Sequence, residues 1–252
     1  MPSFAVILPS AGRSSRFRDK EKKPFANLDG RAIWLRTAEH FVARHDVCQC
    51  IMVVSKDDQE MVRRRYGANL AFMNVQIADG GPERFESVAN ALKLVKSDAD
   101  LVAIHDAVRP CLTEELVNAV FARAAQTGAA LLAVPVGDTV KRVDDQHRVQ
   151  ETLQRKGLWL AQTPQVFRRD WLEAAYAARA RLGRDITDDA QLIEATGHTV
   201  TVVEGAVSNI KITTRADLAL AEAILKSQPK PRASGPSHPF AEEEQMWGGR
   251  GV

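Results

Sequence analysis

Apolar and polar positions alternate along the chain in two ways. Short apolar runs rich in β-branched residues are typical of buried strands, and they lie at 4–8, 51–55, 101–104 and 129–134. Longer segments have apolar residues at helical spacing, and they lie at 34–42, 85–95 and 116–121. Strands that are apolar throughout, with helices between them, predict an α/β protein with a mostly parallel sheet covered on both faces.

A polar segment at 137–156 interrupts this alternation. Charged residues there crowd around β-branched ones, which predicts a hairpin with a strand at 140–143, a turn at 144–147 and a return strand. A two-stranded ribbon is marginal in water unless something packs on it, so an exposed arm of this kind indicates a partner subunit. A solvated surface hairpin is the alternative.

The chain divides into a folded part, 1–226, and a tail, 227–252. The tail is rich in proline and glycine and has no apolar period, so we expect it to be disordered. The whole chain has 252 residues, of which 45% are hydrophobic and 26% charged. That is enough to bury one sizeable core, in one domain or a tight pair.

Net charge and cysteine usage narrow the class of protein. Thirty-four basic and 32 acidic residues leave a formal charge of +2, too small a bias to indicate binding to nucleic acid or to a membrane surface. Cys48, Cys50 and Cys111 have neither CxxC spacing nor matching histidine clusters, so we expect no disulfide framework and no structural zinc. No run approaches the roughly 18 apolar residues of a membrane span. We therefore expect a cytoplasmic protein.

Ligands of parallel α/β sheets bind at the carboxyl ends of the strands, so the loops after Leu8, Ile104 and Val134 are the places to search. The first of these loops begins with small residues, and six basic residues follow within 13–23. Small residues let backbone N–H groups approach phosphate oxygens, and arginine and lysine supply cationic donors, so the loop is interpreted as a polyphosphate cradle. Neither a Walker A loop nor GxGxxG is present. A solvated basic loop is the alternative.

Seven motifs carry a family resemblance. The first loop, Pro9-Ser10-Ala11-Gly12-x3-Arg16-Phe17 followed by Lys23, resembles that of nucleotidyltransferases which activate sugar or polyol phosphates. Further segments resemble, in order and spacing, the 2-C-methyl-D-erythritol 4-phosphate cytidylyltransferase family of non-mevalonate isoprenoid synthesis. They are Gly80-Gly81-Pro82-Glu83-Arg84-x2-Ser87-Val88, His105-Asp106-Ala107-Val108-Arg109-Pro110, Pro135-Val136-Gly137-Asp138-Thr139-Val140-Lys141, Gly157-Leu158-Trp159-x2-Gln162-Thr163-Pro164-Gln165, Thr187-Asp188-Asp189-Ala190 and Gly205-x3-Asn209-Ile210-Lys211-Ile212-Thr213.

The resemblance spans about residues 4–225 and implies a Rossmann-like three-layer α/β/α nucleotidyltransferase fold with a protruding β-arm. The implied reaction transfers the CMP moiety of CTP to 2-C-methyl-D-erythritol 4-phosphate and releases pyrophosphate. In the family pattern, Arg16 and Lys23 stabilise the transition state. Nucleotide-binding positions implied by the match are Pro9, Ser10, Ala11, Gly12, Lys23, Gly80, Gly81 and Ser87.

Asp106 follows an apolar strand at its carboxyl end, where a carboxylate can bind Mg²⁺ that bridges phosphates. A helix cap or turn residue is the alternative for Asp106. The neighbouring His105 is interpreted as a hydrogen-bonded structural residue, because the attacking phosphate is already ionised near neutral pH and needs no base.

The resemblance also implies residues that bind or orient the polyol phosphate, namely Asp106, Arg109, Thr139, Arg155, Thr187 and Lys211. Of these, Arg155 and Lys211 are also expected to act in catalysis. In the family the arm, with Thr139 and Arg155, reaches into the site of a neighbouring subunit, which implies a homodimer. Lys211 lies in an expected short strand at 209–213, where a half-buried ammonium needs an anionic partner.

Some positions depart from the family pattern, and other functions stay open. Ser10 stands at the second small position of the first loop and Ser14 at a family glycine, and Lys23-Pro24 replaces Lys-Gln. Pro82 stands where some members carry aspartate, and Ser208 replaces an acid. Alternative functions are a ribitol 5-phosphate cytidylyltransferase and a non-catalytic nucleotide-binding module. A glycosyltransferase with Asp98-Ala99-Asp100 as its DxD motif is disfavoured, because that triplet precedes its strand. A serine hydrolase lacks support, because no GxSxG elbow follows a strand.

Overall fold

The computed structural model describes residues 1–12, 22–181 and 186–228 of the chain. The tail expected at 227–252 lies outside the described residues except for its first two positions. Its disorder and the boundary at 226 therefore stay predictions. The last described helix, α7, extends over Arg215–Ser227.

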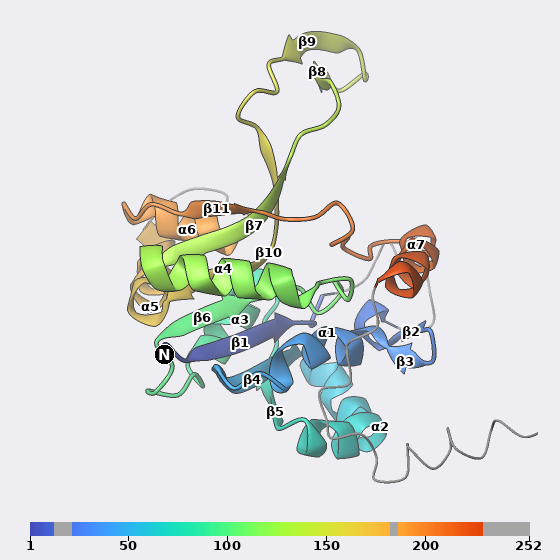
Figure 1. The fold of residues 1–252 in the computed structure, drawn as a ribbon, viewed down its shortest axis with the longest axis vertical. Coiled ribbons are helices and arrows are strands. Elements are labelled where there is room, and N and C mark those ends of the chain that lie inside the picture. Colours follow the sequence, from blue (N-terminus) through green and yellow to red (C-terminus); the bar gives the residue numbers. More distant parts are fainter. Residues whose placement is uncertain (13–21, 182–185, 229–252) are drawn as a thin grey trace, which may run out of the picture.

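A seven-stranded sheet forms the centre of the molecule, in the order β11-β7-β10-β6-β1-β4-β5. All neighbouring pairs are parallel except the two that involve β10, which is antiparallel to β6 and β7. The predicted mostly parallel sheet is thus confirmed (Figure 1). The strands are β1 Phe4–Pro9, β4 Val47–Val54, β5 Val75–Asp79, β6 Leu101–Ile104, β7 Ala129–Pro135, β10 Trp159–Arg168 and β11 Thr201–Glu204.

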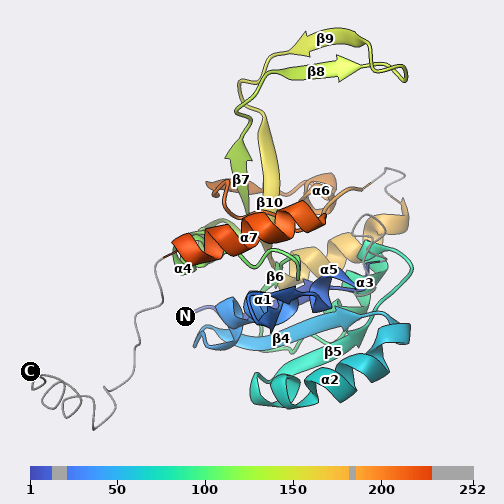
Figure 2. The same cartoon turned by 90° about the vertical axis from the view of Figure 1, so that its right-hand side faces the viewer.

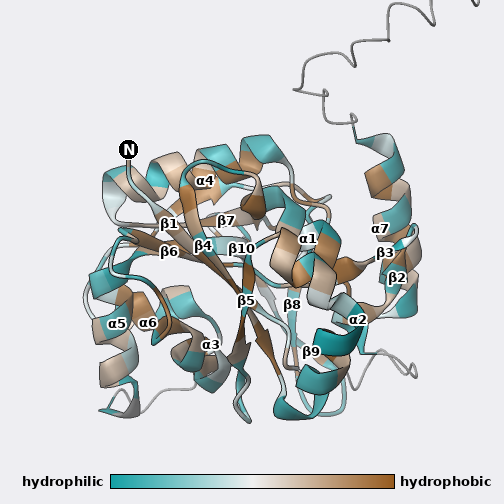
Figure 3. Ribbon diagram, turned by 90° about the horizontal axis from the view of Figure 1, so that it is seen from below, coloured by the Kyte–Doolittle hydropathy of each residue, from teal (hydrophilic) through white to brown (hydrophobic). Residues whose placement is uncertain are grey.

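Helices cover both faces of this sheet, which gives the three layers expected (Figure 3). The α-helices are α1 Ile33–Val42, α2 Gln59–Phe72, α3 Arg84–Leu92, α4 Glu114–Thr127, α5 Arg169–Ala178, α6 Asp189–Ala195 and α7; the 3-10 helices are η1 Lys23–Phe25, η2 Lys56–Asp58 and η3 Arg179–Arg181. Helices α1, α2 and α4 share one core with the sheet, and α3, α5 and α6 share the other. Within the described ranges, every helix is too short or too polar to cross a membrane.

The alternation of side chains along β1 builds both cores. Val6 and Leu8 belong to the cluster that contains Trp34 of α1, whereas Ile7 belongs to the cluster that contains Val88 of α3. All five side chains are fully buried. Because successive residues of a strand face opposite sides, one apolar run supplies both layers and fixes where the loop after β1 leaves the sheet.

The predicted arm is present as a separate two-stranded sheet of β8 (Val140–Val143) and β9 (Val149–Leu153), paired antiparallel. Figures 1 and 2 show it standing away from the body on extended connections from β7 and β10. Its strands are exposed almost throughout. Apolar side chains at the arm and its base are also exposed, among them Val143, Val149, Trp159 and Leu160.

Several expected boundaries are wrong. Residues 209–213 form an irregular segment and not a strand, because their backbone groups bond to a loop and to a side chain and not to a neighbouring strand. The backbone N–H of Ile212 donates to Val108 O at 2.9 Å, and the carbonyl of Asn209 accepts from the Arg109 side chain. The strand expected at 51–55 begins earlier, at Val47, and the helix expected at 85–95 ends at Leu92.

Candidate active site

A cavity of about 310 Å³ opens at the carboxyl ends of β1, β5 and β6, beside the first turn of α3. It is where the loops after Leu8 and Ile104 were expected to meet a ligand. The loop after Val134 instead leads into the arm and contributes no lining residue. The lining residues are Pro9, Ser10, Ala11, Gly12, Lys23, Pro24, Gly81, Pro82, Glu83, Arg84, Ser87, Asp106, Val108 and Lys211.

The first loop is fixed to the sheet by Ser10. This residue is buried, and both its backbone N–H, at 3.0 Å, and its hydroxyl donate to Val53 O on the neighbouring strand β4. Gly80 does not line the cavity, but it allows the first loop to lie close to the end of β5. A Cβ built on Gly80 would stand 2.4 Å from the Cβ of Ala11. Close approach of two backbones therefore explains a glycine here.

The first turn of α3 forms the opposite wall. A capping box between Glu83 and Glu86 begins the helix, and the Gly81 N–H donates to Ser87 Oγ at 3.0 Å. Arg84 lines the cavity and was missed as a site residue, although it lies in a quoted motif. Its Nη2 lies 2.7 Å from Asp189 Oδ2. Burial works against the charge of Arg84, but Asp189 outweighs it and raises the pKa of the guanidinium.

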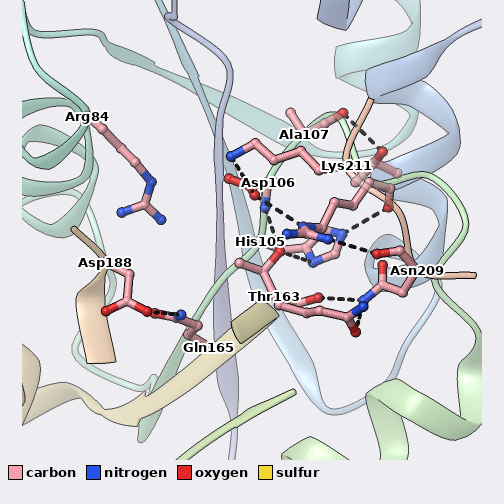
Figure 4. A network of polar contacts seen from close by, with 12 residues as sticks. Arg84, His105, Asp106, Ala107, Thr163, Gln165, Asp188, Asn209 and Lys211 are labelled. Carbon is pink, nitrogen blue, oxygen red and sulfur yellow. Dashed lines mark hydrogen bonds and ion pairs between the residues drawn. The ribbon is translucent and has the colours of Figure 1, made fainter. Parts of the chain in front are cut away.

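Asp106 is a buried carboxylate surrounded by cations (Figure 4). Its Oδ2 lies 3.0 Å from Lys211 Nζ and 3.2 Å from Arg109 Nε. Burial raises the pKa of the carboxyl, but the positive charges of Lys211, Arg84 and Arg109 outweigh burial and hold the pKa below its ordinary value. Asp106 is therefore ionised at neutral pH, and it is the anionic partner that Lys211 was expected to need.

Hydrogen bonds join the turn after β6 to two distant segments. Arg109 Nη1 donates to Asn209 O at 2.7 Å, which ties the turn to the segment that carries Lys211. Asn209 is fully buried, and its Nδ2 donates to Thr163 O on β10 at 3.0 Å. Three stretches far apart in sequence thus meet around one carboxylate.

His105 is fully buried at the start of the same turn. Its ring nitrogens contact Thr163 Oγ1 at 3.0 Å and Arg109 O at 3.1 Å. Burial lowers the pKa of His105 to about 3, so the ring is neutral at physiological pH. The structure confirms the expectation of a hydrogen-bonded residue here.

Other expected site residues lie elsewhere. Thr139 and Arg155 are exposed on the arm segment, where Arg155 donates to Gly137 O. Thr187 is exposed before α6, and its backbone N–H donates to Gln191 Oε1 at 2.8 Å. Arg16 lies outside the described residues. The described part of the chain thus brings the nucleotide-loop residues, Lys23, Asp106 and Lys211 to one cavity but does not bring Thr139, Arg155 or Thr187 there.

A metal ion could be held only in part by this chain. Within residues 1–12, 22–181 and 186–228, no group of three or more histidine, cysteine or acidic side chains is placed to hold a metal. Mg²⁺ binds through one or two carboxylates and takes its remaining ligands from substrate phosphates and water. Asp106 beside a cationic cavity fits that manner of binding, because Oδ1 takes no part in the two ion pairs of Oδ2.

The DxD triplet lies at the other end of the sheet. Asp100 Oδ2 accepts from the Ser3 N–H at 2.9 Å, at the amino ends of β1 and β6. Neither Asp98 nor Asp100 lines the cavity. The placement agrees with the argument against a glycosyltransferase.

A parallel sheet with a small-residue first loop, a lysine-lined cavity at its strand ends and a protruding arm defines a nucleotidyltransferase of the three-layer α/β/α class. The sequence profile of the 2-C-methyl-D-erythritol 4-phosphate cytidylyltransferase family matches residues 4–227. The chain belongs to this family. It is 43% identical over 234 residues to the 2-C-methyl-D-erythritol 4-phosphate cytidylyltransferase of Rhodopirellula baltica, an alignment that covers 88% of this chain and 95% of the relative.

Solved structures agree with the family match. The 4-diphosphocytidyl-2C-methyl-D-erythritol synthase of Anaerococcus prevotii superposes with a TM-score of 0.77 at 30% identity, covering 89% of this chain and 96% of that one. The 2-C-methyl-D-erythritol 4-phosphate cytidylyltransferase of Thermus thermophilus superposes with a TM-score of 0.74 at 30% identity, covering 90% and 100%. The predicted family and fold are confirmed.

Proposed function

We propose that this chain transfers the CMP moiety of CTP to 2-C-methyl-D-erythritol 4-phosphate. The products are 4-diphosphocytidyl-2-C-methyl-D-erythritol and pyrophosphate, in non-mevalonate isoprenoid biosynthesis. The observation that carries the proposal is the cavity that Lys23, Lys211, the small-residue loop and Asp106 line together. Family membership supplies the substrate pair.

In the proposed reaction, a phosphate oxygen of the acceptor attacks the α-phosphorus of CTP. The new P–O bond forms as the bond to the pyrophosphate leaving group breaks. Such a step depends on alignment and on neutralising negative charge more than on covalent help. Lys23, with Arg16 by its match to the family pattern, would stabilise the charge that accumulates on the pentacoordinate phosphorus.

The nucleotide would lie along the first loop and the start of α3. Ala11 and Gly12 offer backbone contacts to the triphosphate, whereas Ser10, whose N–H and hydroxyl both donate to Val53 O, lines the cavity and fixes the loop. Gly81 and Ser87 line the same cavity toward the base, and their mutual hydrogen bond fixes that wall. Pro82 removes one backbone donor there, so base contacts depend on its neighbours.

The acceptor phosphate would lie near Lys211 and Arg109, whose cationic groups both contact Asp106. Arg155, Thr139 and Thr187 would complete its binding. Arg155 and Thr139 stand on the arm, so we propose that they reach the cavity of a second copy in a homodimer. Exposed apolar side chains at the base of the arm, Trp159 and Leu160, support a protein partner there.

Asp106 would hold Mg²⁺ together with the phosphates of CTP. When bound, the ion would neutralise part of the negative charge of the phosphates. The low pKa of Asp106 keeps its carboxylate ready to coordinate, and Lys211 and Arg109 orient it through Oδ2.

The test is pyrophosphate release with CTP and Mg²⁺, comparing 2-C-methyl-D-erythritol 4-phosphate with ribitol 5-phosphate and using UTP as the control nucleotide. We expect release with CTP and the methylerythritol phosphate, and its loss when the metal is chelated. Preference for ribitol 5-phosphate would move the protein to another branch of polyol activation. If no combination of nucleotide and acceptor releases pyrophosphate, the result would support the non-catalytic nucleotide-binding module.

A further inference from the structure

The turn 105–109 carries both Asp106 and Arg109, so its shape sets two groups of the proposed site at once. It is closed by the Arg109 N–H, which donates to Asp106 O at 3.0 Å. Two side chains from other elements hold its backbone: Thr163 Oγ1 accepts from the Asp106 N–H at 3.1 Å, and Thr37 Oγ1 donates to Ala107 O at 3.0 Å.

The ring of His105 continues the contact through Thr163, and Figure 4 shows it beside Thr163. One ring nitrogen, Nε2, lies 3.1 Å from Arg109 O, and the other, Nδ1, lies 3.0 Å from Thr163 Oγ1. The ring packs against Phe41, with centroids 5.3 Å apart, on its apolar side.

The directions of these hydrogen bonds follow from the chemistry of the partners. A carbonyl oxygen only accepts, so Nε2 carries the proton toward Arg109 O. In a neutral ring Nδ1 then accepts, and the Thr163 hydroxyl donates to it. That leaves the lone pairs of the same hydroxyl for the Asp106 N–H. The chain from Asp106 through Thr163 and His105 to Arg109 is thus satisfied at every atom, in a single tautomer.

We propose that His105 is a positioning residue, which ties Asp106 and Arg109 to strand β10 through Thr163 so that both side chains point at the acceptor phosphate. This role rests on the proposed function. His105 touches no substrate and transfers no proton. Without its ring, the Arg109 carbonyl loses its donor and the Thr163 hydroxyl loses the acceptor of its proton, so the turn is held less firmly.

The test is a set of three variants assayed for kcat, for KM of each substrate and for Tm. His105→Phe keeps the shape of the ring but removes both nitrogens. We expect kcat/KM for the polyol phosphate to fall about 10- to 100-fold, because small misplacements of reacting groups cost rates of this order. The KM for CTP should change by a smaller factor than the KM for the polyol phosphate, because the nucleotide wall is built mainly from other segments and depends on this turn only through Asp106. His105→Gln restores an amide donor toward Arg109 O, and we expect it to recover part of the loss.

The matched control is His40→Phe. His40 is also a histidine with little exposure whose Nε2 contacts a carbonyl, Pro110 O at 3.0 Å, and burial lowers its pKa, but it holds no residue of the cavity. We expect the kcat and both KM values of His40→Phe to stay within about twofold of the wild type, even where its Tm changes as much as that of His105→Phe. Equal losses in His40→Phe and His105→Phe, or a fully active His105→Phe, would overturn the positioning role.

A second measurement needs no variant. Long-range ¹⁵N–¹H spectra of the wild-type protein at neutral pH report which ring nitrogen of His105 carries the proton. The proposal requires the proton on Nε2, and a proton on Nδ1 would overturn it, whether or not His105→Phe folds. An inactive wild-type protein would instead count against the proposed function, so the two failures are distinguishable.

Discussion

The cavity and the arm present their expected site residues in opposite ways. Asp106 and Arg109 are held by contacts at 2.7–3.2 Å with each other and with two distant segments, which carry Thr163 and Lys211. On the arm, Thr139 and Arg155 are exposed, and β8 and β9 pair only with each other in the described structure. Figure 2 shows how far the arm stands from the body.

This contrast indicates two ways of preparing a site. Side chains fixed before substrate arrives stabilise developing charge without reorganisation, as the cavity does around Asp106. Side chains on an exposed ribbon gain a fixed position only when another surface covers them. The proposed site therefore needs one preformed half from the body and one half that forms on association. Four experiments separate these halves.

The largest expected effect belongs to the body. Lys23→Ala removes a cation that lines the cavity, and we expect turnover to fall about 10²- to 10³-fold, the usual loss when a donor to transition-state charge is removed. The affinity for CTP should fall much less. Steady-state kinetics and calorimetry check both values. Lys22→Ala is the matched control, because Lys22 pairs with Asp58 at 2.6 Å and does not line the cavity. Equal losses in turnover and affinity would reduce Lys23 to a binding residue.

The next effect belongs to the arm. Arg155→Ala should lower kcat/KM for the polyol phosphate about 10- to 100-fold, because it removes a charged hydrogen bond. Arg142→Ala, on the same ribbon and paired with Glu151 at 3.5 Å, should change it little. Mixing Arg155→Ala with Lys23→Ala subunits should then restore one working site per heterodimer. A mixture no more active than its components would mean that one chain builds each site.

Much of the fold was predictable because burial leaves a direct pattern. Strands such as β6 and β7 are apolar along their length, and both were expected close to their observed bounds. Helix α2 was not expected, because its buried side chains, Val62, Tyr66 and Leu70, form a narrow stripe among charged residues. The segment 209–213 has the composition of a strand, but none of the described strands pairs with it.

The place of the cavity was predictable where a motif follows directly on a strand end, as at Ser10 and Asp106. Contacts between segments that are distant in the sequence could not be predicted. Arg84 pairs with Asp189, which lies 105 positions away, and no local pattern shows which acid reaches which base. For the same reason, the sequence did not show which group would be the anionic partner of Lys211, and in the structure it is Asp106.

The third experiment measures how strongly the body is preorganised. Asp106→Asn leaves Lys211 and Arg109 without their carboxylate, and we expect the free energy of unfolding at pH 7 to fall by about 2 kcal/mol. The native pKa of Asp106 is depressed, so its contribution is complete above its unfolded pKa of about 4 and declines as pH falls below that value. The difference between variant and wild type should therefore narrow in acid, as urea titrations from pH 7 to pH 3 would show.

Its control is Asp170→Asn. The ion pair of Asp170 with Arg168 is shorter, at 2.6 Å, than the two of Asp106, but both of its side chains are more than half exposed. Exposed pairs contribute about 0–1 kcal/mol, so this variant should stay near the wild type. If the difference in unfolding free energy between Asp106→Asn and the wild type grew as the pH fell, that result would contradict the preorganised cavity.

The smallest expected effect concerns the tail, which belongs to neither half. The family match ends at residue 227 and α7 ends at Ser227, and Gln228 Nε2 donates to Cys111 O at 3.0 Å. Truncation after Gln228 keeps that bond and the cluster in which Leu218 and Ile224 of α7 pack on Ile212, next to Lys211. We expect kcat and KM within about twofold, and Tm within a few degrees, of the values of the full chain. Changes at the surface, away from such contacts, usually alter stability little. A sharp loss of turnover at unchanged Tm would place the tail in the site, and the division into a preformed body and an arm supplied by a partner would then need a third contributor.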